Sequence, residues 1–248
     1  MSGFWQDPYV AGISLTYDGT REEHLQHVLP LLDALQIKAT FFAYPPNLIG
    51  NLKDWKQAAA NGHEIGNAFM YGATDPDGLV PHWPAQTLQT EFEESQELIK
   101  TLDPNGSFAY PAVRTIWSSE GLPIVDEVVN KTIVKVNEEM LSPFATQFQN
   151  ARSPINGFNN PNDINPRAIK SIDADELDAE GLCVLAHVGI SQQAWTVFVF
   201  NGLADSDFDA EAHERFVKWL AERKAAVMIT AFREIARLLP YSEHVKSN

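Results

Sequence analysis

The sequence predicts an α/β protein whose strands form a parallel sheet, either open or closed into a barrel. Short apolar runs alternate with amphipathic helical patterns along the whole chain, and this alternation is typical of repeated β-α units. No linker divides the 248 residues, and the sequence contains no internal repeat. Hydrophobic residues make up 44% of the chain, which is enough for a sizeable core. We therefore expect a single domain over residues 1–248.

The first half of the chain is expected to contain strands at residues 13–17, 39–43 and 63–67, and helices at residues 22–35 and 52–60. The first helix carries leucines and a valine three or four residues apart on one stripe, which is the period of an amphipathic helix. Pro45 and Pro46 stop the second strand. Asn61 and Gly62 are a favourable signal for the C-terminal end of the second helix.

The second half is expected to contain strands at residues 107–110, 132–136, 181–187 and 226–230, and helices at residues 87–102, 122–129, 209–224 and 232–238. The apolar run at residues 181–187 reads as a strong strand. Residues 137–168 are rich in Asn, Pro and Ser, so they are expected to form a long loop.

The composition limits the classes of partner. The chain has 18 Lys plus Arg and 33 Asp plus Glu, so its net charge is −15. Such an acidic surface repels nucleic acid and anionic membranes, whereas neutral or cationic small molecules, including sugars, can bind. No run approaches the length of a membrane span. Residues 1–10 have no basic segment followed by an apolar core, so we expect a cytoplasmic protein, although a chain trimmed of its leader would look the same.

Functional groups of a parallel α/β sheet gather at the C-terminal ends of its strands. In this sequence the residues at those positions are Tyr17, Asp18, Tyr44, Asn67, Tyr110 and His187.

Several of these strand ends resemble motifs of the polysaccharide deacetylases of the NodB-homology type, carbohydrate esterase family 4. SLTYDGT at residues 14–20 is similar to the T-F-D-D-G signature, and GHEIGN at residues 62–67 to the usual lead into H-[ST]-x-x-H. FAYP at residues 108–111 is similar to the third motif, and VLAHVGI at residues 184–190 to the last, a Leu-x-x-His strand end. The resemblance covers about residues 12–238, with the motifs in the correct order, and implies a distorted (β/α) barrel.

The resemblance also implies a reaction, the hydrolysis of an N-acetyl group on a sugar. In that family a divalent metal, held by one Asp and two His, polarises the carbonyl and activates water. A second Asp serves as base, and the late His acts as general acid. Carried onto this chain, Asp18 takes the place of the base and His187 that of the acid.

All three metal ligands that the resemblance implies are missing from this chain. The metal-binding Asp falls on Gly19, and the two His positions fall on Ala68 and Gly72. These residues offer no side-chain lone pair, so we expect no metal cofactor at the family position. The arginine of the third motif, which would orient the base, falls on Ala109, and Arg152 could reach the same cleft from the long loop.

Three functional hypotheses follow. The first is a deacetylase-like protein that binds carbohydrate with little or no metal-dependent hydrolysis. The second is a metal-independent hydrolase of amide or imide C–N bonds that uses Asp18 and His187, with Arg152 or Arg114 stabilising the oxyanion. The third is a scaffold or interaction protein without a ligand cleft. A carbohydrate or small amide is the expected partner, and the residues expected to bind it are Tyr17, Asn67, Tyr110, Arg152 and Trp195.

Each candidate residue also has a structural interpretation. Asp18 could cap the helix that follows it. His24 and His27 lie three residues apart and are expected on a solvated helix face, and His63 and Glu64 are expected to hold the barrel by hydrogen bonds. Aromatic rings at loop or strand ends can stack on sugars or fill the core. This set contains Tyr17, Tyr44, Tyr71, Tyr110, Trp83, Trp117 and Trp195.

Overall fold

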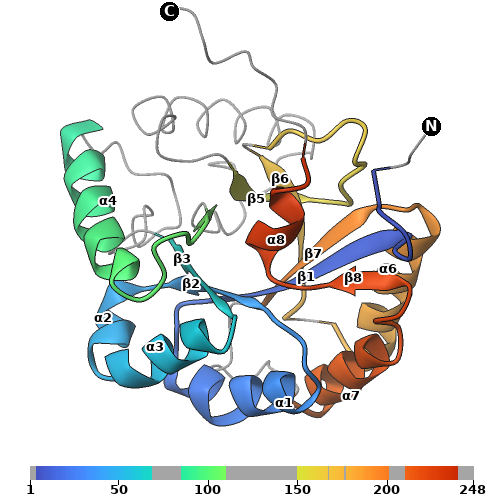
Figure 1. Ribbon diagram of the computed structural model, residues 1–248, viewed down its shortest axis with the longest axis horizontal. Coiled ribbons are helices and arrows are strands. Elements are labelled where there is room, and N and C mark those ends of the chain that lie inside the picture. Colours follow the sequence, from blue (N-terminus) through green and yellow to red (C-terminus); the bar gives the residue numbers. More distant parts are fainter. Residues whose placement is uncertain are drawn as a thin grey trace, which may run out of the picture.

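The computed structural model describes residues 4–68, 85–109, 150–166, 168–175, 177–200 and 210–239 (Figure 1). Several predictions lie outside these residues. They are the helix at 122–129, the strand at 132–136, and the individual residues Tyr71, Gly72, Trp83, Tyr110, Arg114 and Trp117.

The described strands are β1 (Ala11–Asp18), β2 (Thr40–Ala43), β3 (Glu64–Asn67), β4 (Phe108–Ala109), β5 (Ala151–Asn156), β6 (Ile169–Asp173), β7 (Trp195–Phe200) and β8 (Val227–Ile229). They form one sheet in the order β2-β3-β4-β5-β6-β7-β1-β8, and every pairing within it is parallel. A further pairing between β1 and β2 closes the sheet into a barrel. The predicted α/β fold with a distorted (β/α) barrel is therefore confirmed.

The distortion lies at β1, which changes partners along its length. Ala11–Ile13 pair with β8, whereas Thr16–Asp18 pair with β2, and the other edge of β1 pairs with β7. Only the C-terminal half of β1 therefore closes the barrel against β2. Asp18 is the last residue of this half and pairs in register with Phe42.

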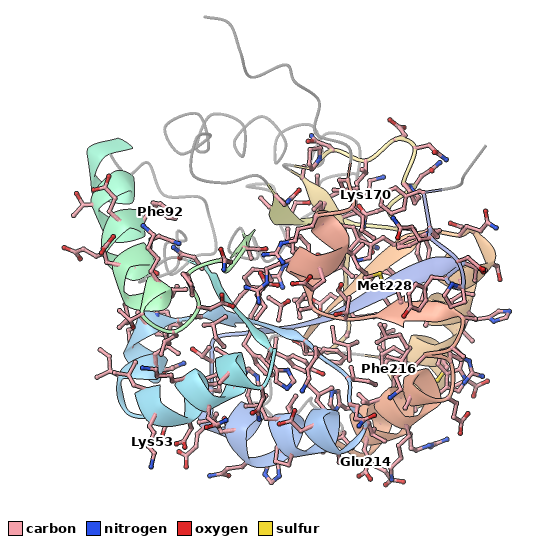
Figure 2. All side chains as sticks on the ribbon, in the orientation of Figure 1. Lys53, Phe92, Lys170, Glu214, Phe216 and Met228 are labelled. Carbon is pink, nitrogen blue, oxygen red and sulfur yellow. The ribbon has the colours of Figure 1, made fainter. Side chains whose placement is uncertain are left out.

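Helices cover the outside of the barrel and close one end of it. They are the π-helix η1 (His24–Val28), α1 (Leu29–Ala34), α2 (Pro45–Ile49), α3 (Leu52–Ala60), α4 (Ala85–Lys100), α6 (Ala179–Ser191), α7 (Ala210–Ala221) and α8 (Phe232–Ala236). In Figure 1, α1, α3 and α7 form a layer below the strands. Figure 2 shows how α7 is oriented: Phe216 points toward the sheet and is fully buried, while Glu214 points away from it.

Two apolar clusters lie on the two faces of the sheet, because neighbouring residues of a strand point to opposite faces. The outer cluster joins Ile13, Leu15 and Tyr17 of β1 to the helix layer. The inner cluster fills the barrel with Phe42, Trp195 and Val197, and the residues of α8 pack against it. The even-numbered residues of β1 face this interior, as the hydrogen bonds of Ser14 and Thr16 show.

The structure corrects the prediction of a strand at residues 181–187. These residues lie in α6, whose first turn is capped by Asp178 Oδ1, which accepts a hydrogen bond of 2.7 Å from the Gly181 N–H. The apolar run continues around the helix, even though Val184 is 54% exposed, so periodicity alone could not distinguish this helix from a strand. The strand is β7, which follows α6 and was not predicted.

The expected loop at residues 137–168 is also corrected in part. Residues 151–156 form β5, and the following strand, β6, was not predicted either. Pro45 and Pro46 end β2 as expected, and they also begin α2, since proline is tolerated in the first turn of a helix. None of the helices in the described part of the chain has the length and apolarity needed to cross a bilayer.

Candidate functional site

An ion pair between Asp18 and Arg152 lies at the C-terminal end of β1. Arg152 Nη1 donates to Asp18 Oδ1 at 2.7 Å, and Nη2 donates to Oδ2 at 2.5 Å. The carboxylate side chain is 18% exposed and that of Arg152 is 3% exposed. Such a two-point contact fixes the orientation of both groups. Arg152, which was expected to reach Asp18 from a loop, contacts it from the strand β5.

Two further residues hold the guanidinium in place. Thr16 Oγ1 accepts a hydrogen bond of 2.7 Å from Arg152 Nη1 and donates its own to the carbonyl of Phe198 at 2.8 Å. The ring of Phe42 lies 4.6 Å from the guanidinium carbon. Neither residue was predicted from the sequence to take part in the site. The signal that could have found Thr16 is its position two residues before Asp18, which places both on one face of the strand.

The position of Arg152 compensates for a departure from the family pattern. Ala109 of β4, where the resemblance places the orienting arginine, is the register partner of Arg152 on β5. Side chains of register partners on neighbouring strands point to the same face, and the strands lie about 5 Å apart. An arginine on the next strand therefore makes the contact with Asp18 that an arginine at position 109 was expected to make.

The residues present do not fit a divalent metal bound through Asp18. Gly19 follows it at φ +97 and has no side chain, and Ala68 packs against the inner apolar cluster. Both carboxylate oxygens of Asp18 already accept hydrogen bonds from a cation, whose charge would repel a second one. Gly72, the remaining position of the family's ligand set, lies outside the described residues.

Tyr17 and Asn67, both expected to bind ligand, face the helix layer instead. Tyr17 is fully buried and stacks between Phe41 and Phe200, with ring centroids 5.1 Å from each. The side chain of Asn67 is also fully buried and bonds to α4, accepting from Ser95 Oγ at 2.9 Å and donating to Gln96 Oε1 at 2.8 Å. Neighbouring strand residues point to opposite faces, so Tyr17 cannot share the interior with Asp18.

Trp195 and His187 do not lie beside Asp18. Trp195 begins β7, is 1% exposed and donates from Nε1 to Ser14 Oγ at 3.1 Å, so it is a core residue. His187 is exposed on α6, near the end of the helix that leads into the start of β7. The start of β7 pairs with the start of β1. His187 is therefore near the opposite edge of the barrel from Asp18, and the two residues do not form an acid–base pair.

His63 and Glu64 are buried and have the structural role expected of them. Glu64 Oε1 accepts from the backbone N–H of Ser107 at 2.7 Å, and Oε2 accepts from Thr40 Oγ1 at 2.7 Å and from the N–H of Arg233 at 2.9 Å. These bonds tie β2 and β3 to the first turn of α8. His63 Nδ1 accepts from the N–H of Ala39 at 3.3 Å.

A second buried polar cluster lies between β1, η1 and α7. Tyr17 Oη and His213 Nε2 are 2.7 Å apart, and the ring of His24 lies 5.6 Å from that of Tyr17. Burial lowers the pKa of His213 to about 4 and that of His24 to about 3, and it raises the pKa of Tyr17. His27 is exposed as expected, but the prediction of a solvated His24 is wrong because η1 turns that side chain into the core.

Comparisons with known proteins agree with this architecture. Residues 10–114 match the polysaccharide deacetylase family. The uncharacterized protein YlxY of Bacillus subtilis is 33% identical over 91 residues, a region that covers 35% of this chain and 28% of YlxY. The match therefore spans less than a third of that relative.

Solved structures cover almost the whole chain at low sequence identity. The catalytic domain of a peptidoglycan N-acetylglucosamine deacetylase from Eubacterium rectale superposes with a TM-score of 0.57 at 14% identity, covering 100% of this chain and 98% of that one. BA3943, a CE4 family pseudoenzyme from Bacillus anthracis, superposes with a TM-score of 0.54 at 16% identity, covering 93% of this chain and 66% of that one. Residues 10–114 therefore match the polysaccharide deacetylase family by sequence, and the chain resembles solved structures of the CE4 family in its fold.

Proposed function

We propose that this chain is a deacetylase-like protein that binds carbohydrate and performs little or no metal-dependent deacetylation. One observation carries the proposal: the Asp18 carboxylate is held at both oxygens by Arg152. The positions of Gly19 and Ala68 offer no side-chain donor beside it. A solved relative in fold, BA3943, is itself described as a CE4 family pseudoenzyme.

The ion pair suits binding better than catalysis. Its carboxylate retains lone pairs that can accept hydrogen bonds from sugar hydroxyls, because two guanidinium bonds leave part of its accepting capacity free. The hydrolase alternative required His187 as the acid, and the position of His187 on α6 leaves Asp18 without that partner. We therefore propose binding at the Asp18–Arg152 pair and no hydrolysis by Asp18 with His187.

The test measures acetate release and binding on the same oligomer. The purified protein is incubated with the tetramer of N-acetylglucosamine, with either zinc or a chelator present, and binding is followed by calorimetry. We expect no acetate release above that of Asp18→Asn in either condition. We also expect measurable binding that Asp18→Asn weakens at least fivefold. Asp54→Asn, an exposed carboxylate on α3, is the matched control and should bind as the unmodified protein does.

Two results would count against the proposal. Zinc-dependent acetate release that the chelator removes would show a working metal centre. If the protein binds no oligomer, and Asp18→Asn is indistinguishable from the unmodified protein, the scaffold hypothesis would be favoured.

Restoring the missing ligands provides a positive control. Gly19→Asp, Ala68→His and Gly72→His together supply the donors of the family, but an aspartate at φ +97 is strained, at a cost of about 1–2 kcal/mol. We expect weak zinc binding by this triple variant and at least tenfold tighter binding after Arg152→Met is added, because the competing cation is removed. A mutant of BA3943 with restored enzymatic activity has the same fold, with a TM-score of 0.55 at 15% identity.

A further inference from the structure

A cavity of about 350 Å³ lies at the edge of the barrel where β1 and β7 begin, opposite the edge that holds Asp18. Three aromatic residues of the N-terminal segment, Phe4, Trp5 and Tyr9, line one side. Neutral amides line the other side, from the loop after β5 and from the turn between α6 and β7. In Figure 1 the blue N-terminal segment runs beside the yellow loop that follows β5. We call this cavity the amide pocket.

Hydrogen bonds fix the walls of the amide pocket. Trp5 Nε1 donates to the carbonyl of Gln193 at 2.7 Å, which joins the N-terminal segment to the α6–β7 turn. The backbones of Asn159 and Trp195 exchange two hydrogen bonds of 2.9 and 3.0 Å, which pin the loop after β5 to the start of β7. The N–H of Val10 donates to the carbonyl of Ala226 at 2.9 Å. The backbone of the pocket is therefore formed before any ligand enters, and binding needs to order only its side chains.

The polar groups of the amide pocket are uncharged and largely uncommitted. The lining contains no Asp, Glu, Lys, Arg or His. The side-chain amides of Asn162, Gln192 and Gln193 and the hydroxyl of Tyr9 form no hydrogen bond with the other described residues. Amides can donate and accept at once, as sugar hydroxyls require. Aromatic faces suit the apolar side of a pyranose ring.

Size and charge narrow the class of ligand. The volume is at the lower end of the range for small-molecule sites, about 300–1,000 Å³, which excludes large cofactors. A charged ligand would find no counter-ion in the lining, and the chain's net charge of −15 repels anions from its surface.

We propose that the amide pocket is a second carbohydrate site, which takes one or two neutral sugar rings. It differs from the Asp18–Arg152 pair in position, because the two lie at opposite edges of the barrel. It also differs in chemistry, because amides and aromatic rings recognise the ligand there and no ion pair takes part. A protein with two separated sites can hold two glycan strands, or two parts of one, without hydrolysing either.

The experiment uses the Asp18→Asn protein, so that binding at the Asp18–Arg152 pair is already weakened. Two neutral probes, the tetramers of N-acetylglucosamine and of glucose, are titrated by saturation-transfer NMR and calorimetry. We expect at least one to bind, and Asn162→Ala with Gln192→Ala to weaken that binding at least fivefold. Tyr9→Ala should have a similar effect. Gln57→Ala changes an exposed amide on α3 and should leave binding unchanged.

Loss of all binding in the Asp18→Asn protein would overturn the second site while leaving the proposed function intact. Unchanged binding in the Asn162→Ala/Gln192→Ala and Tyr9→Ala proteins would also overturn it. Binding that depends on these residues but not on Asp18 would support the second site even if binding at the Asp18–Arg152 pair failed its own test. Circular dichroism spectra of each variant distinguish a lost contact from a lost fold.

Discussion

Asp18 and Arg152 come from strands that are not neighbours in the barrel, so their contact spans its interior. Each charge is largely removed from water and depends on the other, together with Thr16 and the ring of Phe42. Breaking a buried pair from one side leaves an uncompensated charge, which is strongly destabilising. The same two residues therefore contribute to the proposed binding cleft and to the stability of the barrel.

Replacing Arg152 by alanine should lower the free energy of unfolding by about 2–4 kcal/mol, because it leaves the Asp18 carboxylate without its cation. Urea denaturation measures the change. Lys38→Ala removes one of the three side-chain partners of Asp33, in a pair whose side chains are 32% and 34% exposed, so it should cost less than about 1 kcal/mol.

Adding Ala109→Arg to Arg152→Ala tests whether the arginine can be exchanged between the two strands. The two positions are register partners, so the new guanidinium can reach Asp18, and we expect about half of the lost stability to return. A double variant less stable than Arg152→Ala would show that position 109 has no room for the side chain. It would contradict our account of compensation between β4 and β5.

The α6 helix shows how packing decides a segment that its own residues leave ambiguous. Its middle is apolar on almost every side, and a short run of this kind suits a buried strand as well as a helix. Asp178 caps its first turn, and Gly189 allows the helix to approach β7 closely. A Cβ added at Gly189 would lie 2.0 Å from Thr196 Oγ1.

Gly189→Ala should therefore destabilise the protein by about 1–3 kcal/mol, because overpacking outweighs the gain in helix propensity of about 1 kcal/mol. Thermal or urea unfolding measures the change. Val184 on the same helix is 54% exposed, so Val184→Ala should leave stability unchanged or raise it by a few tenths of a kcal/mol. A stabilised Gly189→Ala protein would show that α6 does not pack against β7 in this way.

In the described part of the chain, buried polar groups join the layers of the molecule. Glu64 joins β2 and β3 to α8, and the cluster of Tyr17, His213 and His24 joins β1 to the helix layer. Because both histidines are held neutral by burial, the folded state excludes protons that the unfolded chain would bind.

This exclusion gives stability a defined dependence on pH. The folded pKa values of about 4 for His213 and about 3 for His24 lie below the ordinary value of 6.5. Their contribution is complete above pH 6.5 and is lost as the pH falls towards the folded values, on the order of 3 kcal/mol for each histidine by pH 4. Urea denaturation between pH 7 and pH 4 gives the slope of the free energy of unfolding against pH. His213→Gln should remove the share of this slope that His213 contributes. His187→Gln, at an exposed site, should keep the full slope.

Much of the architecture could be predicted from local patterns. The alternation of strands and helices indicated a parallel α/β fold, and α3 was predicted with the bounds Leu52–Ala60. The helix predicted from the apolar stripe of residues 22–35 and the end of the strand predicted from Pro45 and Pro46 were also correct. Both signals act within a few residues, through hydrophobic periodicity and through the restricted backbone of proline. The loss of side-chain donors at Gly19 and Ala68 can be read from the chain alone, since it depends only on which residues stand there.

The surroundings of each candidate residue depended on contacts between distant parts of the chain. Tyr17, Asn67 and Trp195 are polar-tipped or aromatic residues at strand ends, and nothing local distinguishes a pocket wall from a core position for them. The barrel places all three in the interior of the protein, and it puts His187 at the far edge from Asp18. The pairing of Asp18 with Arg152 joins residues 134 positions apart. Such contacts arise from the closure of the sheet, and no periodicity within one segment can encode them.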